Sequence, residues 1–255
     1  MRLSDFKVLT FDTYGTLIDW ETGIHSALAP LLEKLERAPS RNRVLEFFAQ
    51  AESAQQAETP NMIYSDVLSA VYRELAKGWS IAVGDEDAVR FATSIKDWPA
   101  FEDSAPALQY LKPHYTLITL TNCDRESYKG SDSRLGRPWD AIYTAEDTES
   151  YKPSRQNFEY LLVRVDNDFG FRKKDILHVA QSLFHDHEPA TALGLATAWI
   201  DRRQDLEGHG ATTPPQAHAA QIFNLRAWPI SSGLIRTSFA RQRLHEWVVG
   251  STISI

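Results

Sequence analysis

Residues 7–20 contain an apolar run that stops abruptly at a carboxylate. Residues 8–11, with the sequence VLTF, are long and apolar enough to predict one buried strand. Asp12 comes directly after this run, and Gly15 follows shortly after it. Ligands of open parallel sheets bind outside the carboxyl ends of the strands, which is where Asp12 would lie. Aspartate also initiates turns, so the spacing alone is compatible with a ligand-facing or a purely structural Asp12.

Between residues 22 and 96 the apolar residues recur at helical spacing, with no strand pattern among them. Pro30 is expected to start or kink a turn, Gly78 to end the third helix, and Asp85 to be the N-cap of the fourth. The four apolar faces consist of Ile24, Leu28, Leu31, Leu32 and Leu35; Val44, Phe47, Phe48 and Ala51; Ile63, Val67, Leu68, Val71 and Leu75; and Val89, Ala92 and Ile95. The pattern fits an inserted helical module or an ordinary N-terminal bundle.

From residue 97 onward, strand patterns alternate with helix patterns, which predicts a doubly wound, mainly parallel sheet. Residues 98–101 contain Pro99 and are expected to form a hinge that leads into this part of the chain. A loop is expected at residues 208–216. The predicted strands are residues 115–120, 141–143, 176–180 and 197–200, with an edge strand at 221–224; the predicted helices are residues 104–111, 154–165, 188–193 and 234–248.

The composition excludes several classes of partner. The chain has 255 residues and a net charge of −7, which disfavours nucleic acid and anionic membranes as non-specific partners. No apolar run approaches the roughly 18 residues of a membrane span, and residues 1–7 do not have the pattern of a secretory signal. The single cysteine, Cys123, has no internal disulfide partner, which is typical of a reducing compartment. We therefore expect a cytoplasmic location.

The sequence FDTYGTL, residues 11–17, resembles the first motif of the haloacid dehalogenase (HAD) superfamily, whose nucleophilic aspartate ends the first strand. Phosphatases of that superfamily carry a second aspartate where this chain has Tyr14, whereas an aromatic residue there is typical of the L-2-haloacid dehalogenase (type II) branch. The resemblance implies an α/β, Rossmann-like HAD core formed by residues 1–18 and 97–255. It also implies an inserted α-helical cap domain, residues 19–96.

Two further segments agree with this resemblance. Thr121 and Asn122 end a predicted strand, where the family binds the anionic group of the substrate and the departing halide, although such residues also initiate turns. Lys152 lies in an SYKP setting that matches the third motif of the family. A lysine before such a turn is usually a solvated charge. Next to Asp12, however, its ammonium would lower the pKa of that carboxyl by about 1–3 units and keep it ionised.

The fourth motif matches the superfamily least well, because Gln181 also departs from the dehalogenases, which have a serine at its position. Asp186 is the acid that the dehalogenases and the phosphatases share, but Gln181 stands where phosphatases keep an acidic Mg²⁺ ligand. Magnesium prefers charged oxygen donors, so this substitution argues against metal-dependent phosphoryl transfer. The sequence of residues 185–187, His-Asp-His, also suggests a zinc site. Adjacent residues on a turn rarely converge on one ion, and we expect a solvated loop there.

The chain also departs from the dehalogenase pattern around the leaving group. The family holds the halide with an arginine from the early cap, and residues 50–57 contain none. Phe158 occupies the place of a family tyrosine, and Leu183 the place of an asparagine. Cys123 has no adjacent histidine base and is expected to be a small buried side chain rather than a catalytic thiol. The resemblance ends near Arg202.

The resemblance implies hydrolysis of a small 2-haloacid through a covalent aspartyl ester, without a metal or other cofactor. Asp12, Lys152 and Asp186 would be catalytic. The substrate-binding or positioning residues would be Tyr14, Thr16, Thr121, Asn122, Trp98 and Phe101. The alternatives are a divergent phosphatase, which would require Mg²⁺, a non-catalytic protein that retains the fold, and the same chemistry on another substrate. The expected partner is a small-molecule substrate. A homodimer, common in this branch, could bury the predicted helix of residues 234–248.

Overall fold

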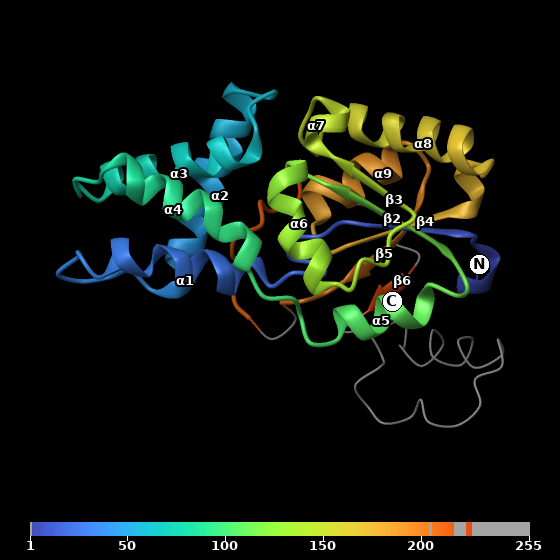
Figure 1. Ribbon diagram of the computed structural model, residues 1–255, viewed down its shortest axis with the longest axis horizontal. Coiled ribbons are helices and arrows are strands. Elements are labelled where there is room, and N and C mark those ends of the chain that lie inside the picture. The colour runs from blue at the N-terminus through green and yellow to red at the C-terminus, as the bar shows by residue number, and fades with distance from the viewer. Residues whose placement is uncertain (1, 204–205, 217–222, 226–255) are drawn as a thin grey trace.

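A parallel sheet forms the centre of the computed structural model, which describes residues 2–203, 206–216 and 223–225 (Figure 1). The strand order is β3-β2-β1-β4-β5-β6, and every pairing is parallel. The chain moves from β1 to one side of the sheet and then crosses to the other side, as in a doubly wound fold. The predicted α/β class is therefore confirmed. The strands are β1 (Val8–Phe11), β2 (Thr116–Thr121), β3 (Ala141–Thr144), β4 (Ile176–Ala180), β5 (Ala196–Ile200) and β6 (Phe223–Leu225).

The central strand, β1, contributes to two separate apolar cores, because successive side chains of a strand point to opposite faces of the sheet. Val8 packs in a core with side chains of α8 and α9, whereas Leu9 and Phe11 belong to a core shared with α5 and the inserted helices. All four residues of β1 are buried. The helices outside the insertion are α5 (Ser104–Leu111), α6 (Arg125–Arg134), α7 (Ala145–Thr148), α8 (Arg155–Phe169) and α9 (Glu188–Ala192), with 3₁₀ turns η1 (Leu3–Asp5) and η3 (Lys173–Asp175) and a π-helical turn, η4 (Leu183–His187).

The segment between β1 and α5 is helical and extends away from the sheet (Figure 1). Its two connections run side by side: Ile18 and Ala100 form an antiparallel bridge, and the Asp19 amide donates to the Pro99 carbonyl at 2.8 Å. This pairing closes the insertion at its base. We call this segment the inserted helices; it comprises α1 (Trp20–Leu32), α2 (Arg41–Glu58), α3 (Tyr64–Gly78), α4 (Asp85–Thr93) and the 3₁₀ turn η2 (Ser94–Asp97).

Two details of the inserted helices differ from the sequence expectations. Asp85 is the first residue of α4 rather than its N-cap, which is Gly84; the Asp87 carboxylate accepts a hydrogen bond from the Gly84 amide. The buried face of α4 also differs from the expected one: it includes Ala88, whereas Val89 is 53% exposed. Pro30 lies inside α1, near its end.

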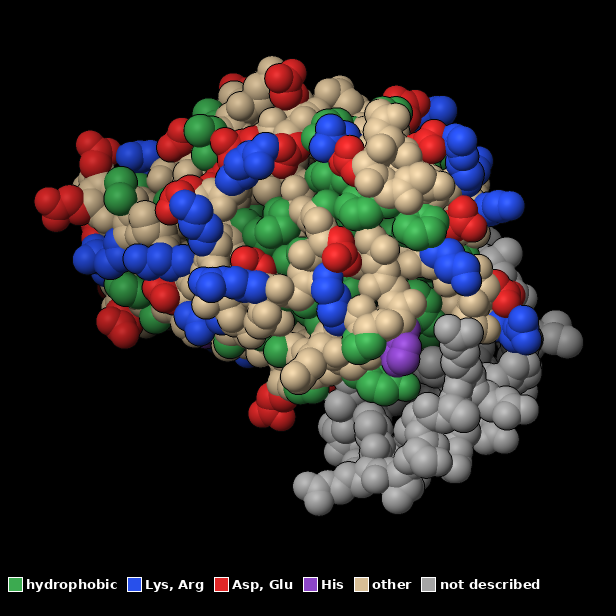
Figure 2. All heavy atoms as spheres, turned by 45° about the vertical axis from the view of Figure 1, so that its right-hand side comes forward, with side chains coloured by type: hydrophobic (Ala, Val, Ile, Leu, Met, Phe, Trp, Pro, Cys, Tyr) green, Lys and Arg blue, Asp and Glu red, His purple; other side chains and the backbone are tan. Residues whose placement is uncertain are grey.

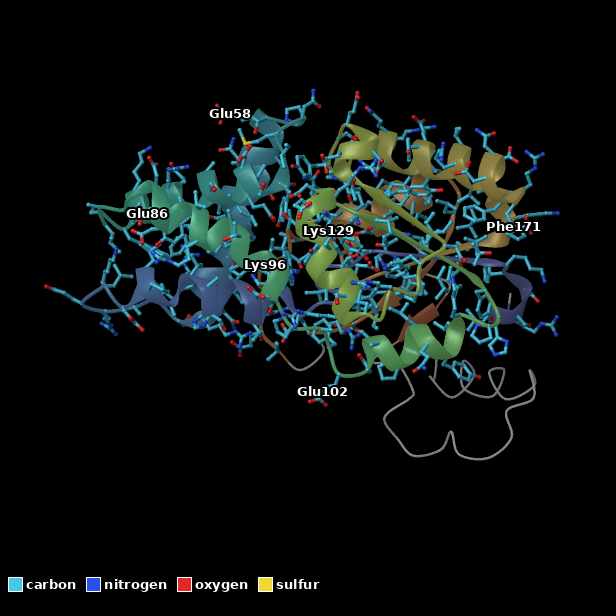
Figure 3. The ribbon with its side chains drawn as sticks, in the orientation of Figure 1. Glu58, Glu86, Lys96, Glu102, Lys129 and Phe171 are labelled. Carbon is cyan, nitrogen blue, oxygen red and sulfur yellow. The ribbon has the colours of Figure 1, made fainter. Side chains whose placement is uncertain are left out.

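Helices α6 and α7 were not expected from the sequence. Only Tyr128 and Ser131 of α6 are buried, so the segment has no apolar periodicity to reveal it. Helix α6 packs against η2 at Gly130, where a Cβ atom would lie 2.3 Å from the backbone oxygen of Lys96. The labelled Lys96 and Lys129 mark this junction in Figure 3. A glycine therefore permits the close approach of the core to the inserted helices.

The chain after β5 first forms a segment without helix or strand, residues 206–216, as predicted for residues 208–216. It then reaches β6, which overlaps the predicted edge strand, while the helix predicted at residues 234–248 lies outside the described residues. Among the described residues, no helix combines the length and apolarity that crossing a membrane requires. Acidic and basic side chains are interspersed on the face of the molecule shown in Figure 2.

Candidate active site

A small cavity lies at the carboxyl ends of β1, β2 and β4, where the chain order of a doubly wound sheet switches direction. Asp12 directly follows β1, and its amide donates to the Val179 carbonyl of β4 at 3.0 Å, so its backbone is fixed by the sheet. The cavity has a volume of about 40 Å³. Its lining consists of Asp12, Tyr14, Trp20, Glu52, Gln56, Tyr64, Asn122, Lys152, Gln181, Ser182, His185, Asp186 and Thr212. We call it the Asp12 cavity.

Both carboxylate oxygens of Asp12 are held by side chains. Lys152 Nζ donates to Oδ1 at 2.8 Å, and the Thr16 hydroxyl donates to Oδ2 at 2.6 Å. Thr16 Oγ1 in turn accepts the backbone amide of Gln181 at 2.9 Å, which joins the loop after β1 to the end of β4. Asp12 is 7% exposed and remains accessible only from the cavity. The carboxylate is thus positioned in one orientation.

Lys152 is buried, with 2% of its surface exposed, rather than a solvated surface lysine. Its ammonium also donates to the Leu120 carbonyl at 3.1 Å and to Asp186 Oδ1 at 2.6 Å. Asn122 fixes the backbone of this lysine: its amide nitrogen donates to the Lys152 carbonyl at 3.0 Å, and its Oδ1 accepts the Lys152 amide at 2.7 Å. The Lys152 ammonium therefore joins Asp12 after β1, Leu120 of β2 and Asp186 of η4.

Asp186 lies in η4, so the expectation of a solvated loop at residues 185–187 was wrong. Asp186 and His187 are 1% and 0% exposed. His178 of β4, which the sequence reasoning missed, lies with Nε2 3.0 Å from Asp186 Oδ1 and Nδ1 2.8 Å from the Thr10 hydroxyl. An ionised carboxylate only accepts hydrogen bonds, so Nε2–H donates to Asp186, while Nδ1 is hydrogen-bonded to the Thr10 hydroxyl. The signal that could have identified His178 in the sequence was a histidine within a run of strand residues.

The second oxygen of Asp186, Oδ2, is buried and has no hydrogen-bond partner among the described residues. Its neighbour Oδ1 already receives the Lys152 ammonium and His178. A buried carboxylate oxygen with free lone pairs is able to accept a hydrogen bond from a water or substrate hydroxyl in the cavity.

The three charged groups shift one another's pKa values. Burial raises the pKa of Asp186, but Lys152 and His178 together outweigh it and hold that pKa below its usual range. Burial lowers the pKa of Lys152, and the two carboxylates raise it by more. For Asp12, burial outweighs the opposing effects of Lys152 and Thr16, so its pKa is raised. The lysine thus lowers the Asp12 pKa as expected, but burial, which the sequence does not reveal, has the larger effect.

Tyr14 contributes its ring to the cavity lining, while its hydroxyl bonds to Ser131 at 2.9 Å and donates to Cys123 Sγ at 3.4 Å. Burial raises the pKa of Tyr14 well above its usual range, so the phenol is neutral near pH 7. Burial also raises the pKa of Cys123, which is fully buried, so this thiol has none of the features of a reactive cysteine.

Three other residues predicted for the site lie outside the cavity lining. Thr121 Oγ1 accepts the Cys123 amide at 3.3 Å, which is the turn-forming alternative considered for it. Trp98 lies behind Tyr14, with its ring centroid 5.7 Å from that of the tyrosine. The ring of Phe101 lies 4.1 Å from the Arg202 guanidinium and lines a neighbouring cavity of about 270 Å³.

Glu52, Gln56 and Tyr64 enter the cavity from the inserted helices and were not anticipated. Glu52 and Gln56 are four residues apart on one face of α2, a spacing visible in the sequence but not distinctive. Arg41, the first residue of α2, lines the neighbouring cavity instead, and no arginine lines the Asp12 cavity among the described residues.

The residues at the cavity do not fit a magnesium ion. The Lys152 ammonium lies between Oδ1 of Asp12 and Oδ1 of Asp186, where a cation shared by the two carboxylates would have to be. The amide oxygen of Gln181, in place of a third acid, accepts the Thr212 hydroxyl at 3.0 Å. Within the described parts of the chain, no group of three or more His, Cys, Asp or Glu residues is arranged to hold a metal.

The fold of the chain is similar to that of several solved structures. The defluorinating L-2-haloacid dehalogenase Rha0230 has a TM-score of 0.71 at 19% identity, covering 89% of this chain and 94% of that one. The L-2-haloacid dehalogenase from Xanthobacter autotrophicus, with chloropropionic acid covalently bound, has a TM-score of 0.70 at 17% identity, covering 88% and 95%. The chain has the fold of the L-2-haloacid dehalogenases.

The dehalogenase fold also occurs in a magnesium-bound HAD hydrolase, YfnB from Bacillus subtilis. That structure has a TM-score of 0.68 at 17% identity, and the match covers 87% of this chain and 95% of that one. No family model and no curated protein sequence matches the chain. The likeness therefore concerns the fold, and the activity has to be argued from the side chains of the Asp12 cavity.

Proposed function

We propose that this protein is a HAD-type hydrolase that displaces halide from a small 2-haloacid through a covalent ester on Asp12. The observation that supports this most strongly is the pair of hydrogen bonds that fix both Asp12 oxygens at the end of β1, from Lys152 and Thr16. A nucleophile needs a fixed approach to its target, because correct positioning lowers the barrier of a displacement. The small volume of the cavity favours a small substrate.

In the first step, a carboxylate oxygen of Asp12 attacks the carbon that bears the halogen. A C–O bond forms as the carbon–halogen bond breaks, and the halide leaves with the bonding electron pair. Covalent catalysis of this kind divides a difficult displacement into two easier steps. Asp12 is 7% exposed at a small cavity that Tyr14 and Trp20 help to line, which limits hydration of the attacking carboxylate.

In the second step, water attacks the ester carbonyl carbon of Asp12 and releases a 2-hydroxy acid. Asp186 Oδ2, buried and without a protein partner among the described residues, is the group that accepts a hydrogen bond from this water. Lys152 stabilises the negative charge that develops on the ester oxygens, since its ammonium lies 2.8 Å from Asp12 Oδ1. No step requires a metal ion.

The test is chloride release from L-2-chloropropionate in the presence of EDTA, with Asp12→Asn as the control. We expect release by the wild-type protein that EDTA does not reduce, and none by the variant. Turnover of an aryl phosphate only with added Mg²⁺ would instead support the phosphatase alternative, which the position of Lys152 between the two carboxylates disfavours. If the protein has neither activity and Asp12 is not covalently labelled, the result would support a non-catalytic protein. Covalent labelling of Asp12 without halide release would indicate the same chemistry on a substrate other than a haloacid.

A further inference from the structure

The inserted helices contribute a carboxyl group to the Asp12 cavity. Glu52 of α2 is 5% exposed, and its Oε1 accepts a hydrogen bond from the Tyr64 hydroxyl of α3 at 2.5 Å. Tyr64 is buried as well, and Gln56 lies one helical turn after Glu52 on α2. The side of the cavity formed by the inserted helices thus carries an acid that is held in place by a tyrosine.

Glu52 has no positively charged partner in the described part of the chain. Among residues 2–203, 206–216 and 223–225 it forms no ion pair, and Tyr64 is its one side-chain hydrogen-bond partner. Asp124 and Asp66, which interact electrostatically with Tyr151, are further acids near this pair. Three other titratable groups, Tyr14, Tyr151 and Cys123, interact with Glu52 or Tyr64. Burial raises the pKa of each of these three groups, so all are neutral near pH 7. Within the described parts of the chain, no positively charged group therefore pairs with Glu52 when it ionises.

The rest of the lining has a deficit of positive charge. Among the described residues that line the cavity, Lys152 is the only lysine or arginine, and it is already shared by the carboxylates of Asp12 and Asp186. Burial lowers the pKa of His185 to about 4, so its imidazole is neutral at pH 7. When Asp12 and Asp186 are both ionised, as attack by Asp12 requires, the lining has more negative than positive charge even before Glu52 is counted.

We propose that Glu52 is a specificity-determining residue that makes the Asp12 cavity prefer small 2-halogenated compounds with an uncharged, hydrogen-bond-donating end, such as 2-haloamides, over the corresponding carboxylate anions. An ionised Glu52 repels a second carboxylate, and two unit charges a few ångströms apart at the effective dielectric of a protein change affinity by about tenfold or more. An amide N–H, in contrast, donates to the Glu52 oxygen that Tyr64 does not use. This inference rests on the proposed carbon–halide chemistry.

The same reasoning gives a pH dependence. Burial raises the pKa of Glu52 to about 7, despite the opposing hydrogen bond from Tyr64. Below that pH the group is neutral and tolerates a carboxylate; above it the anion is rejected. The reaction of the amide balances in the same way as that of the acid: Asp12 forms a C–O bond as the carbon–chlorine bond breaks. Water then attacks the ester carbonyl carbon of Asp12. The former Asp12 oxygen leaves as the hydroxyl of the hydroxyamide, the water oxygen remains in the regenerated carboxylate, and one proton is released.

The experiment compares chloride release from 2-chloropropionamide and 2-chloropropionate at pH 5.5 and 8.5. We expect the wild-type protein to prefer the amide about tenfold or more in kcat/KM at pH 8.5 and much less at pH 5.5. In Glu52→Gln the preference at pH 8.5 should fall by about the same factor, through a lower KM for the acid. Glu58→Gln is the matched control, because Glu58 is exposed at the end of α2 (Figure 3).

Calorimetric binding of lactamide and lactate at pH 8.5 separates this inference from the proposed function. Tighter binding of lactamide by the wild-type protein, with the difference lost in Glu52→Gln, supports the role of Glu52 even if neither chloro compound releases chloride. Chloride release that favours the acid at pH 8.5, and that Glu52→Gln leaves unchanged, overturns the role of Glu52 while the carbon–halide chemistry stands. Equal affinity for the two compounds, or no binding of either, also overturns it.

Discussion

The ammonium of Lys152 lies 2.8 Å from Oδ1 of Asp12, although 140 positions separate the two residues in the chain. This contact brings the segment after β3 to the end of β1, and both groups are almost fully buried. A buried charge is stable only with a partner, so the site depends on the lysine for its electrostatic balance.

Replacing this lysine should therefore affect activity and stability together. In Lys152→Met, two buried carboxylates lose their shared cation, and we expect a loss of activity of about 10²-fold or more and a decrease in the free energy of unfolding of roughly 3–5 kcal/mol at pH 7. The decrease should shrink in acid, where the carboxyls become protonated. Urea unfolding across pH checks this, with Lys129→Met on the surface of α6 as control. Equal stability of the two variants would contradict the pairing.

The hydroxyl of Thr16 offers a subtler change at the nucleophile. Thr16→Val removes the donor to Asp12 Oδ2, one of the contacts that oppose the rise in the Asp12 pKa. Since activity requires ionised Asp12, the acid limb of the kcat/KM profile should move upward by about 0.5–1 pH unit, in line with one lost hydrogen bond. Thr16→Ser keeps the hydroxyl and should leave the limb in place. A limb that moves equally in both variants would indicate a steric effect.

Asp186 and its neighbour His178 should govern the second step rather than the first. Asp186→Asn retains the shape of the side chain but weakens its hold on water, so the Asp12 ester should form and persist. Mass spectrometry of the quenched protein should then show an addition equal to the substrate minus hydrogen halide, localised to Asp12. Asp85→Asn, whose carboxyl is exposed on α4, is the control. If Asp186→Asn forms no ester on a compound that the wild-type protein turns over, Asp186 acts before the ester forms.

The sequence was sufficient for the parts of the fold that obey simple periodicities. The run of residues 8–11 became β1, and Ile176–Ala180 became β4 with the predicted bounds. Helix α6 was missed because Tyr128 and Ser131 are its only buried residues, and its position is set by Gly130 against η2. Contacts between distant segments determine such an element, and they leave no local pattern.

The candidate site likewise has residues that the sequence predicts and residues that only tertiary contacts bring together. Asp12, Lys152 and Asp186 follow strand ends or match short motifs, and the structure brings them together. Glu52 has no such signal, because its burial results from the inserted helices closing over the cavity. The net shift of the Asp12 pKa was out of reach for a related reason: the sequence identified the neighbouring lysine, which lowers that pKa, but not the extent of desolvation, which raises it.

The junction between α6 and η2 can be tested through its glycine. A Cβ on Gly130 would lie 2.3 Å from the Lys96 carbonyl oxygen, a contact that only a shift of the backbone could relieve. Gly130→Ala should therefore lower the free energy of unfolding by about 1–3 kcal/mol despite the better helix propensity of alanine. Gly78→Ala, where nothing lies within 4 Å of the new Cβ, should be neutral or stabilising. Thermal unfolding of the two variants provides the measurement, and equal shifts would contradict the close approach.

The buried carboxyl of Glu52 should make the protein less stable as the pH rises. Its pKa is about 7 in the folded protein and 4.5 in the unfolded reference, so between these values the folded state binds more protons. Its contribution is fully present below pH 4.5 and is lost as the pH rises through 7. The unopposed charge above that pH costs on the order of 3 kcal/mol.

Glu52→Gln should remove this dependence, because the amide cannot ionise and its oxygen still accepts from Tyr64. Relative to the wild-type protein, the variant should gain stability at pH 8 and gain little or none at pH 5. Urea unfolding at both pH values, with exposed Glu58→Gln as control, measures the difference between the two proteins. A constant difference across this range would mean that Glu52 keeps one protonation state, and the proposed pH-dependent rejection of anions would then lose its basis.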